Sequence, residues 1–440
     1  MSISERMKRF GWWKVVDAKV AEITDIQIPS IQSSRALLLV LMSVLTGGCA
    51  VPREHPVDHG TLRGGLDAES SAQLDSLVRD VCGKTVVMLG EEPHHAGGHT
   101  LEIKSALVQR LIERCGFNAI YFESGVYEFA DLDRRLAAGT SAPEQVADAI
   151  GGLWSVSSAI DLLVGYLYSQ ATAGKIRLAG LDPQLGSATS GYEKAALVDD
   201  LMQGLNEPRR STCAEVISRR TNGRYDSEHP DDAAERERLV ECFREAGDAA
   251  QPDSVVFVLA RTTQAILTNP PAGGPGWEAR ERQMAHLFRW HQRQSPGASR
   301  AIVWTANVHA ARYAENVSGP VRPFGDELQA EYGHRLASIA FTAMGGAYGR
   351  GDSTPIAAGP ESLEARVLAG GAQPLRYLPK AALAELGLVD ALLLNYAKTR
   401  RADWSLLFDG AVVLREEKPL HQDRPASPRF VPVGGDRPGR

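Results

Sequence analysis

Short apolar runs that alternate with amphipathic segments constrain the fold of this chain more than any other feature. The runs "TVVML" (85–89), "AIYFE" (119–123) and "KIRLAGLD" (175–182) are separated by segments with helical spacing. Such runs are typical of parallel strands that are buried on both faces, with helices as the connections between them. We therefore predict an α/β fold with a mainly parallel central sheet flanked by helices.

The same pattern divides the rest of the chain. Residues 100–115 predict a helix because the apolar positions repeat at i, i+4, and further strands are predicted at 300–310, 334–344 and 409–417. Residues 190–295 are charge-rich and helical, which indicates a helical insertion within one domain spanning 69–422. Pro, Gly and Arg dominate residues 423–440, so we predict a disordered tail.

The N-terminal segment has the features of a secretory leader. Arg35 precedes an apolar run at 36–45, and Gly47 and Gly48 precede Cys49. The run is too short to span a bilayer but suits the core of a signal peptide. Residues 1–48 then form the leader, Cys49 becomes the lipidated first residue, and 49–68 form a tether. This predicts a lipoprotein anchored in the outer membrane and facing the periplasm; the alternative is a buried or interfacial helix.

Charge and cysteine content narrow the possible partners. The net charge is −6, with no long basic run, which argues against a nucleic-acid partner. Without Cys49 an even number of cysteines remains, which permits two disulfides in an exported protein. Strand adjacency favours a Cys82–Cys115 pair, and one helical segment holds both Cys213 and Cys242. Four buried free thiols are equally compatible with the sequence.

Polar side chains gather at the ends of the predicted strands. In open α/β sheets, ligands bind at the carboxyl ends of the strands. The segment "LGEEPHHAGGH" (89–99) follows the first of these strands and holds three histidines and two glutamates. The candidates at the strand ends are Glu91, His94, Glu123, Asp182, Asn307 and His309. Their convergence on one sheet edge predicts a catalytic pocket.

These side chains suit hydrolysis of an ester by an activated water molecule. His94 would remove the proton from water, because an imidazole titrates near neutral pH. Glu91 or Glu123 would orient the imidazole, and His309 would polarise a carbonyl or protonate a leaving alkoxide. No G-x-S-x-G motif indicates a serine nucleophile. The bland alternatives are a helix N-cap for Asp182 and a core histidine for His309.

A metal site is the competing interpretation of the same residues. Two histidines and one or two carboxylates suffice to bind zinc with an open coordination position. However, no H-E-x-x-H motif is present, and Gly97 and Gly98 would break a helix pairing His95 with His99. Haem ligation by an exposed histidine is a further variant.

The segment "VVMLGEEPHHAGGHTLEIKSALVQRLIERCGFNAIYFESG" resembles the erythromycin esterase family. Later segments strengthen the resemblance in the family's order, among them "GGLWSVSSAIDLLVGYL", "IRLAGLDPQ", "AIVWTANVHAARY" and "LFDGAVVLREEKPLHQ". The resemblance implies hydrolysis of an ester or lactone without metal or cofactor. By position it implies His94 as the base with Glu91 beside it, Glu123 as the strand-end glutamate and His309 as the second histidine. It also implies Lys104 as the basic residue of the following helix.

Departures from the family pattern fall in the same loop. Pro93 replaces a Ser or Thr, and His95 replaces a Gly, so we expect an altered pocket. We count Lys104, His95, Asp182 and Asn307 as candidate substrate-binding residues, whereas His99 has no assigned role. The same broad fold resembles haem-binding lipoproteins of the ChaN type and Tiki-like metalloproteases. A haem- or metal-binding lipoprotein is therefore the alternative function.

Overall fold

A computed structural model describes most of the predicted domain. The described residues are 66–184, 194–222, 228, 232–269, 274–295, 299–314, 317, 319, 321–351 and 353–423. The predicted leader, Cys49, most of the predicted tether and nearly all of the predicted tail lie outside them. None of the helices within the described residues is both long enough and apolar enough to cross a membrane.

The central sheet is mainly parallel, as predicted, with the strand order β3-β2-β4-β1-β5-β10-β7. Only β7 and the short β6 run antiparallel to their neighbours. The strands of this sheet are β1 Val86–Leu89, β2 Ala119–Gly125, β3 Arg177–Asp182, β4 Ala301–Trp304, β5 Leu336–Tyr348, β6 Thr354–Pro355, β7 Leu375–Pro379 and β10 Gly410–Glu417. A separate antiparallel hairpin pairs β8 Leu388–Ala391 with β9 Arg400–Asp403.

Both faces of the sheet are buried, and successive side chains of each strand enter opposite cores. In β1, Val86 and Met88 belong to one apolar cluster, whereas Val87 and Leu89 belong to the other. This two-residue alternation in uniformly apolar strands is why the runs lack the polar positions of a half-solvated sheet.

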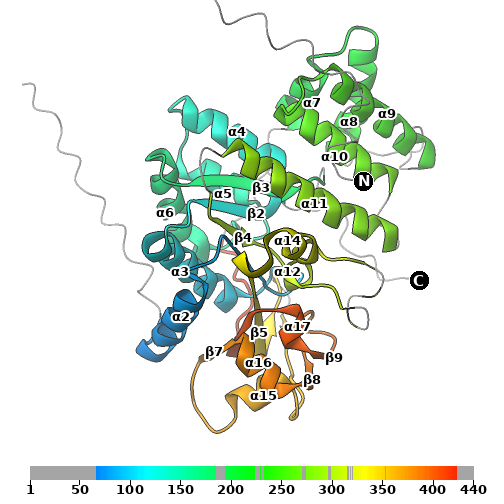
Figure 1. Cartoon of the computed structure of the whole chain (residues 1–440). Coiled ribbons are helices and arrows are strands. Elements are labelled where there is room, and N and C mark those ends of the chain that lie inside the picture. Colours follow the sequence, from blue (N-terminus) through cyan, green and yellow to red (C-terminus); the bar gives the residue numbers. More distant parts are fainter. Residues whose placement is uncertain are drawn as a thin grey trace, which may run out of the picture. The chain divides into compact units, whose positions relative to one another are not determined.

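Helices cover the two faces (Figure 1). Among the helices that pack in the cluster containing Val87 and Leu89 are α2 Ala68–Val81, α3 Gly98–Cys115, α5 Pro143–Ile150 and α6 Asp161–Thr172. The elements between β3 and β4 are helical: α7 Lys194–Met202, α8 Arg209–Asn222, α9 Ala233–Ala249, α10 Val255–Thr268 and α11 Gly274–Gln294. The remaining helices are α4 Val126–Ala137, α12 Asn307–Ala310, α14 Phe324–Tyr332, α15 Leu363–Leu368, α16 Lys380–Leu386, α17 Trp404–Leu407 and the 3-10 turns η2 Ser158–Ile160 and η3 Gly333–Arg335.

The parallel register brings the carboxyl ends of four strands to one edge. Val86 of β1 and Ala119 of β2 both lie opposite Ala301 of β4, and β3 pairs with β2. Gly90 follows β1 in close contact with Asn307, and any side chain at Gly90 would collide with the Asn307 amide. The loops after these strands are therefore packed against one another, and they carry the candidate site.

Two disulfides fix pairs of segments that are distant in sequence. Cys82 after α2 is bonded to Cys115 at the end of α3, and Cys213 of α8 is bonded to Cys242 of α9. These are the pairs predicted from strand adjacency and from the helical segment, and the free-thiol alternative is not observed.

One predicted element differs in a way that matters for the site. The strand predicted at 300–310 ends at Trp304, and Asn307–Ala310 form the short helix α12. His309 and Asn307 therefore reach the sheet edge from a helical turn. The β8–β9 hairpin and β7 were not predicted, because their apolar runs are short and carry charged residues.

Candidate active site

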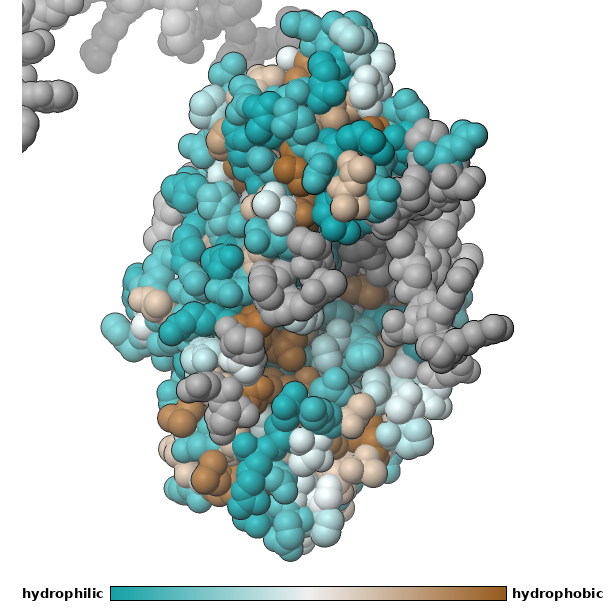
Figure 2. Space-filling view, turned by 90° about the vertical axis from the view of Figure 1, so that its right-hand side faces the viewer, coloured by the Kyte–Doolittle hydropathy of each residue, from teal (hydrophilic) through white to brown (hydrophobic). Residues whose placement is uncertain are grey.

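A cavity of about 1010 Å³ opens at this sheet edge. Its inner wall contains His95, Glu123, Asp182, Arg280, Glu281 and His309. Apolar side chains form much of the rest of the lining: Leu153, Trp277, Val308, Val317, Val321, Pro323 and Leu394. Figure 2 shows one face of the molecule hollowed near its middle, with hydrophobic residues in the hollow. A mostly apolar cavity with a few convergent polar groups is typical of a small-molecule site.

Glu91 organises the loop after β1. Its Oε1 accepts hydrogen bonds from the indole N–H groups of Trp154 at 3.1 Å and Trp304 at 3.0 Å. The same oxygen lies 2.7 Å from Nδ1 of His95, and the Nζ of Lys104 lies 3.2 Å from Oε2. Burial of Glu91 would raise its pKa, but the Lys104 ammonium and His95 outweigh burial and lower it. Glu91 is therefore a buried carboxylate held in one orientation.

His95 takes the place that the sequence predicted for His94. The side chain of His95 is buried, with Nδ1 on Glu91 and Nε2 3.7 Å from Glu123. His94 is 58% exposed and its nearest carboxylate is Glu92 at 3.6 Å. The predicted contact between His94 and Glu91 is therefore not observed, although His94 does line the pocket.

The physical reason for this difference is the backbone of the loop. The Glu92 carboxylate accepts hydrogen bonds from the backbone N–H groups of His94 and Ala96, which closes a tight turn. His95 lies within this turn at φ +53°. That left-handed conformation costs a non-glycine residue about 1–3 kcal/mol and is found where function needs it. It directs the His95 ring inward and leaves the ring of His94 outside.

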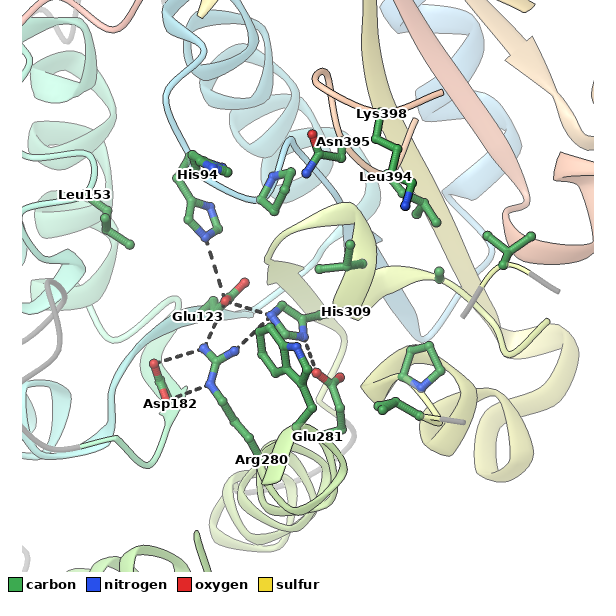
Figure 3. A pocket seen from close by; sticks show the side chains of 18 of the residues that line it. His94, Glu123, Leu153, Asp182, Arg280, Glu281, His309, Leu394, Asn395 and Lys398 are labelled. Atoms are coloured by element: carbon green, nitrogen blue, oxygen red, sulfur yellow. Dashed lines mark hydrogen bonds and ion pairs between the residues drawn. The ribbon is translucent and has the colours of Figure 1, made fainter. Parts of the chain in front are cut away.

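Glu123 at the end of β2 is the centre of the inner wall (Figure 3). Its Oε2 accepts hydrogen bonds from the Thr305 hydroxyl at 2.7 Å and the Ala306 N–H at 2.8 Å. Its Oε1 lies 3.0 Å from both Arg280 Nη2 and His309 Nε2. Burial raises the pKa of Glu123, but the adjacent His309 and His95 lower it to well below the usual range.

Arg280 of α11 joins two strand ends. Its guanidinium donates to Asp182 through Nε at 3.3 Å and Nη2 at 3.1 Å, and it contacts Glu123 at the same time. Asp182 also accepts a hydrogen bond from the N–H of Gln184, as a turn residue would. Burial disfavours the charged guanidinium, but Asp182 and Glu123 raise its pKa further. Asp182 therefore accepts a backbone hydrogen bond within the loop after β3 and also lies in the pocket.

His309 is held between two carboxylates. Its Nδ1 lies 2.5 Å from Glu281 and its Nε2 lies 3.0 Å from Glu123. Burial lowers the pKa of this imidazole, but Glu123 and Glu281 raise it to about 10. Nε2 is also 3.0 Å from Arg280 Nη1. Because a carboxylate faces each ring nitrogen, we assign His309 as a protonated imidazolium that donates to Glu281 and Glu123, so its contact with Arg280 Nη1 is a close approach of two cations and not a hydrogen bond.

The charges of the buried cluster balance. Its carboxylates are Glu91, Glu123, Asp182 and Glu281, and its cationic groups are His95, Lys104, Arg280 and His309. Burial lowers the pKa of His95, but Glu123 and Glu91 raise it to about 9. Buried charges are tolerated only when they are paired and hydrogen-bonded, as they are here.

Lys104 and Asn307 do not line the pocket, contrary to their assignment as substrate-binding residues. Lys104 is fully buried under Glu91, with Nζ 4.2 Å from the centre of the Trp304 ring. Burial lowers its pKa to about 8, although Glu91 opposes this shift. The Asn307 amide donates to the carbonyls of Phe341 and Leu393 and accepts from the N–H of Phe341. Lys104 and Asn307 therefore contact residues that support the site and lie outside the cavity lining.

His99 also has a structural explanation. Its Nδ1 lies 2.9 Å from the carbonyl oxygen of Glu416. Its backbone N–H donates to Glu417, whose carboxylate also accepts the N–H and hydroxyl of Thr100. Glu417 of β10 thereby caps the first turn of α3. His99 thus lies behind the loop, away from the pocket.

Several members of the site were not identified from the sequence. Arg280 and Glu281 lie in α11 within "EARERQM", where alternating charges indicate an exposed helix face. Trp154 donates to Glu91 from a turn after α5. A weak signal for Arg280 exists: Asp182 and Glu123 are two strand-end carboxylates that require a buried cation.

The residues do not form a ready metal site. Across the residues that the structure describes, no group of three or more His, Cys, Asp or Glu side chains is arranged to hold a metal ion. Arg280 lies between Glu123 and Asp182, and Lys104 lies against Glu91. A metal ion on these carboxylates would have to displace a buried cation.

The sheet order and the helices on both faces define an α/β protein whose cavity is lined by histidines and carboxylates. The family model for erythromycin esterase matches residues 112–377, which is more than half of the chain. This chain belongs to the erythromycin esterase family. The match contains Glu123, Asp182, Arg280, Glu281 and His309, but it begins after Glu91, His95 and Lys104.

Solved structures share the fold at low sequence identity. A mutant of the erythromycin esterase EreC in its open conformation is 17% identical, with a TM-score of 0.59, covering 78% of this chain and 93% of that one. A succinoglycan biosynthesis protein is 16% identical, with a TM-score of 0.60, covering 80% of this chain and 92% of that one. Haem-bound ChaN of Campylobacter jejuni reaches a TM-score of only 0.27 at 9% identity, covering 62% of this chain and 89% of that one, and carries no argument. A search of curated protein sequences gives no significant match.

Proposed function

We propose that this protein hydrolyses a carboxylic ester or lactone by attack of a water molecule that His95 deprotonates. The observation that supports this best is the environment of His95. Glu91 accepts from Nδ1, which leaves Nε2 directed at the pocket. The separation of 3.7 Å between Nε2 and Glu123 is beyond hydrogen-bond range. That distance leaves Nε2 available to a water molecule bound between the two groups.

The reaction follows from the positions of the charged groups. The reactive form has neutral His95, whose population grows as the pH approaches its raised pKa of about 9. As the water oxygen attacks the ester carbonyl, its proton passes to Nε2 of His95, and Glu91 stabilises the resulting imidazolium. Arg280 and protonated His309 stabilise the negative charge that develops on the carbonyl oxygen. When the carbon–oxygen bond breaks, the leaving alkoxide takes a proton from His309. The products are a carboxylic acid and an alcohol, joined in one molecule when the substrate is a lactone.

The test compares adjacent histidines as a matched pair. We expect His95→Gln to lower kcat about 10²–10⁴-fold against a panel of aryl esters and lactones, because general base catalysis contributes about that much. His94→Gln, with its ring outside the buried cluster, should change kcat less than about threefold. Far-UV circular dichroism would verify that both variants are folded.

Two outcomes would contradict the proposal in different ways. Loss of turnover in His94→Gln with retained turnover in His95→Gln would assign the base to His94, as the sequence predicted. Absence of turnover by the folded wild-type protein on every ester and lactone of the panel would overturn the hydrolase function itself.

A further inference from the structure

The pocket has a second charged region that the proposed reaction does not use. Lys398 and Arg400 line the cavity from the β8–β9 hairpin, and we call these two residues the rim. Figure 3 shows Lys398 beside Asn395 and Leu394, on the other side of the pocket from Asp182. The rim lies on a separate loop from every residue assigned to the reaction.

The rim cations lack acidic partners among the described residues. Neither Lys398 nor Arg400 makes an ion pair there, and Arg400 lies opposite Ala391 in the hairpin register. The next residue, Arg401, behaves differently: it lies opposite Asp390, and its Nη1 is 3.6 Å from that carboxylate. Because side chains alternate along a strand, Arg400 and Arg401 lie on opposite sides of β9. The hairpin thus pairs the charge that faces away from the pocket and leaves the pocket-facing charge unpaired.

The carboxylates of the cavity do not supply the missing partners. Among the described lining residues, the carboxylates are Glu123, Asp182 and Glu281, and Arg280, His95 and His309 already neutralise them. Another basic lining residue, Arg350, donates to the backbone carbonyls of His95 and Leu153. Burial lowers the pKa of its guanidinium, although Glu92 opposes this shift. The described part of the cavity lining therefore carries excess positive charge, although the whole chain has a net charge of −6. A positive cleft in an acidic protein concentrates anionic ligands.

Apolar side chains form much of the rest of the cavity lining. Val308 and Leu394 line the cavity, as do Val317 and Pro323. A ligand that spans this surface needs an apolar body, because a polar group placed there would lose its hydrogen bonds to water without replacement. The cavity of about 1010 Å³ is large enough for such a ligand.

We propose that the substrate is an ester or lactone with an apolar body and an anionic group that Lys398 and Arg400 bind at the end remote from the scissile bond. This inference rests on the proposed hydrolase function and adds the substrate class. Carboxylate, sulfate and phosphate share the required charge and acceptor geometry, and arginine binds each of them through paired hydrogen bonds. The anionic group positions the ester against His95 without taking part in the reaction.

The experiment uses two aryl esters of equal length. One is the half ester of a linear dicarboxylic acid, with a free terminal carboxylate. In the other, a neutral methyl ketone of the same size replaces that carboxylate. We expect wild-type protein to prefer the anionic ester in kcat/KM, and the Lys398→Gln/Arg400→Gln double variant to lose about tenfold of that preference. The preference should also fall with added salt, since exposed charges are screened. Arg401→Gln is the matched control and should keep the wild-type preference.

Binding measurements make the inference testable independently of turnover. Amide analogues of the two esters would be titrated by calorimetry into wild-type protein and into the double variant. We expect wild-type protein to bind the anionic analogue more tightly than the neutral one, and the double variant to lose part of this difference. That result would support anion binding by the rim even if no ester is hydrolysed. Equal kcat/KM for both esters and equal affinities for both analogues would overturn the inference while leaving the hydrolase function intact. Aryl esters of the same length that carry a terminal sulfate or phosphate in place of the carboxylate would identify the preferred anion.

Discussion

The inner wall and the rim of the same pocket differ in how their charged side chains are paired. On the inner wall, Glu123, Arg280 and His309 are buried, and each charge is in contact with an opposite one. On the rim, Lys398 and Arg400 have no acidic partner among the described residues. Buried charges depend on one another for their stability, whereas exposed charges do not. The inner wall is therefore costly to change and suited to fixed chemistry, while the rim is free to set which ligand is bound.

The largest expected contrast is in the free energy of unfolding. Arg280→Met would leave Glu123 and Asp182 buried without their shared cation, and removing one partner of a buried pair costs about 3–5 kcal/mol. Lys398→Met should change stability by less than about 0.5 kcal/mol. Urea unfolding of both variants measures the difference. Similar stabilities for the two would show that the inner wall is not an interdependent charge cluster.

The second largest expected effect is the pH dependence of stability and activity that the histidines of the inner wall cause. The pKa values of His95 and His309 are raised to about 9 and about 10, above the unfolded value near 6.5. The stability that these two groups contribute is therefore fully present below pH 6.5 and is lost as pH rises through 9 to 10. His95 must be neutral to act as a base, so kcat/KM should rise over the same interval.

Activity and stability are thus expected to move in opposite directions between pH 7 and 10. Turnover profiles and thermal unfolding at matched pH values would measure both, with His95→Gln as the control that loses part of the pH dependence of stability. A rate profile that is flat between pH 7 and 10 would argue against His95 as the base.

The sequence predicted the sheet better than the site, and the reason is physical. Strand identity depends on local apolar patterning, so β1, β2, β3, β5 and β10 were all predicted close to their observed positions. Glu123 was predicted at a strand end and lies at the end of β2, whereas His309 was predicted at a strand end but reaches the pocket from the helical turn α12. The choice between His94 and His95 depends on a turn held by Glu92 and on one left-handed residue. Neither of these has a distinctive local pattern.

Arg280 illustrates a second limit. It lies 157 residues after Glu123 in the sequence, on a helix whose charge pattern predicts a solvent-exposed face. Only the packing of α11 across the ends of β2 and β3 buries it. Long-range pairing of this kind is invisible to periodicity, because the helix pattern is the same whether a charge faces water or a buried partner.

The smallest expected effect concerns His99, which lies in the first turn of α3, after the loop that holds His95, and contacts β10. Its ring nitrogen Nδ1 lies 2.9 Å from the Glu416 carbonyl oxygen, and Glu417 already caps α3 through backbone N–H groups. His99→Ala should therefore cost about 1 kcal/mol or less of stability and leave kcat/KM for esters unchanged. Urea unfolding and ester assays on this variant measure both quantities. A large loss of activity would mean that the contact of His99 with β10 helps to hold His95 in position. The inner wall would then depend on residues behind the pocket as well as on its own buried charges.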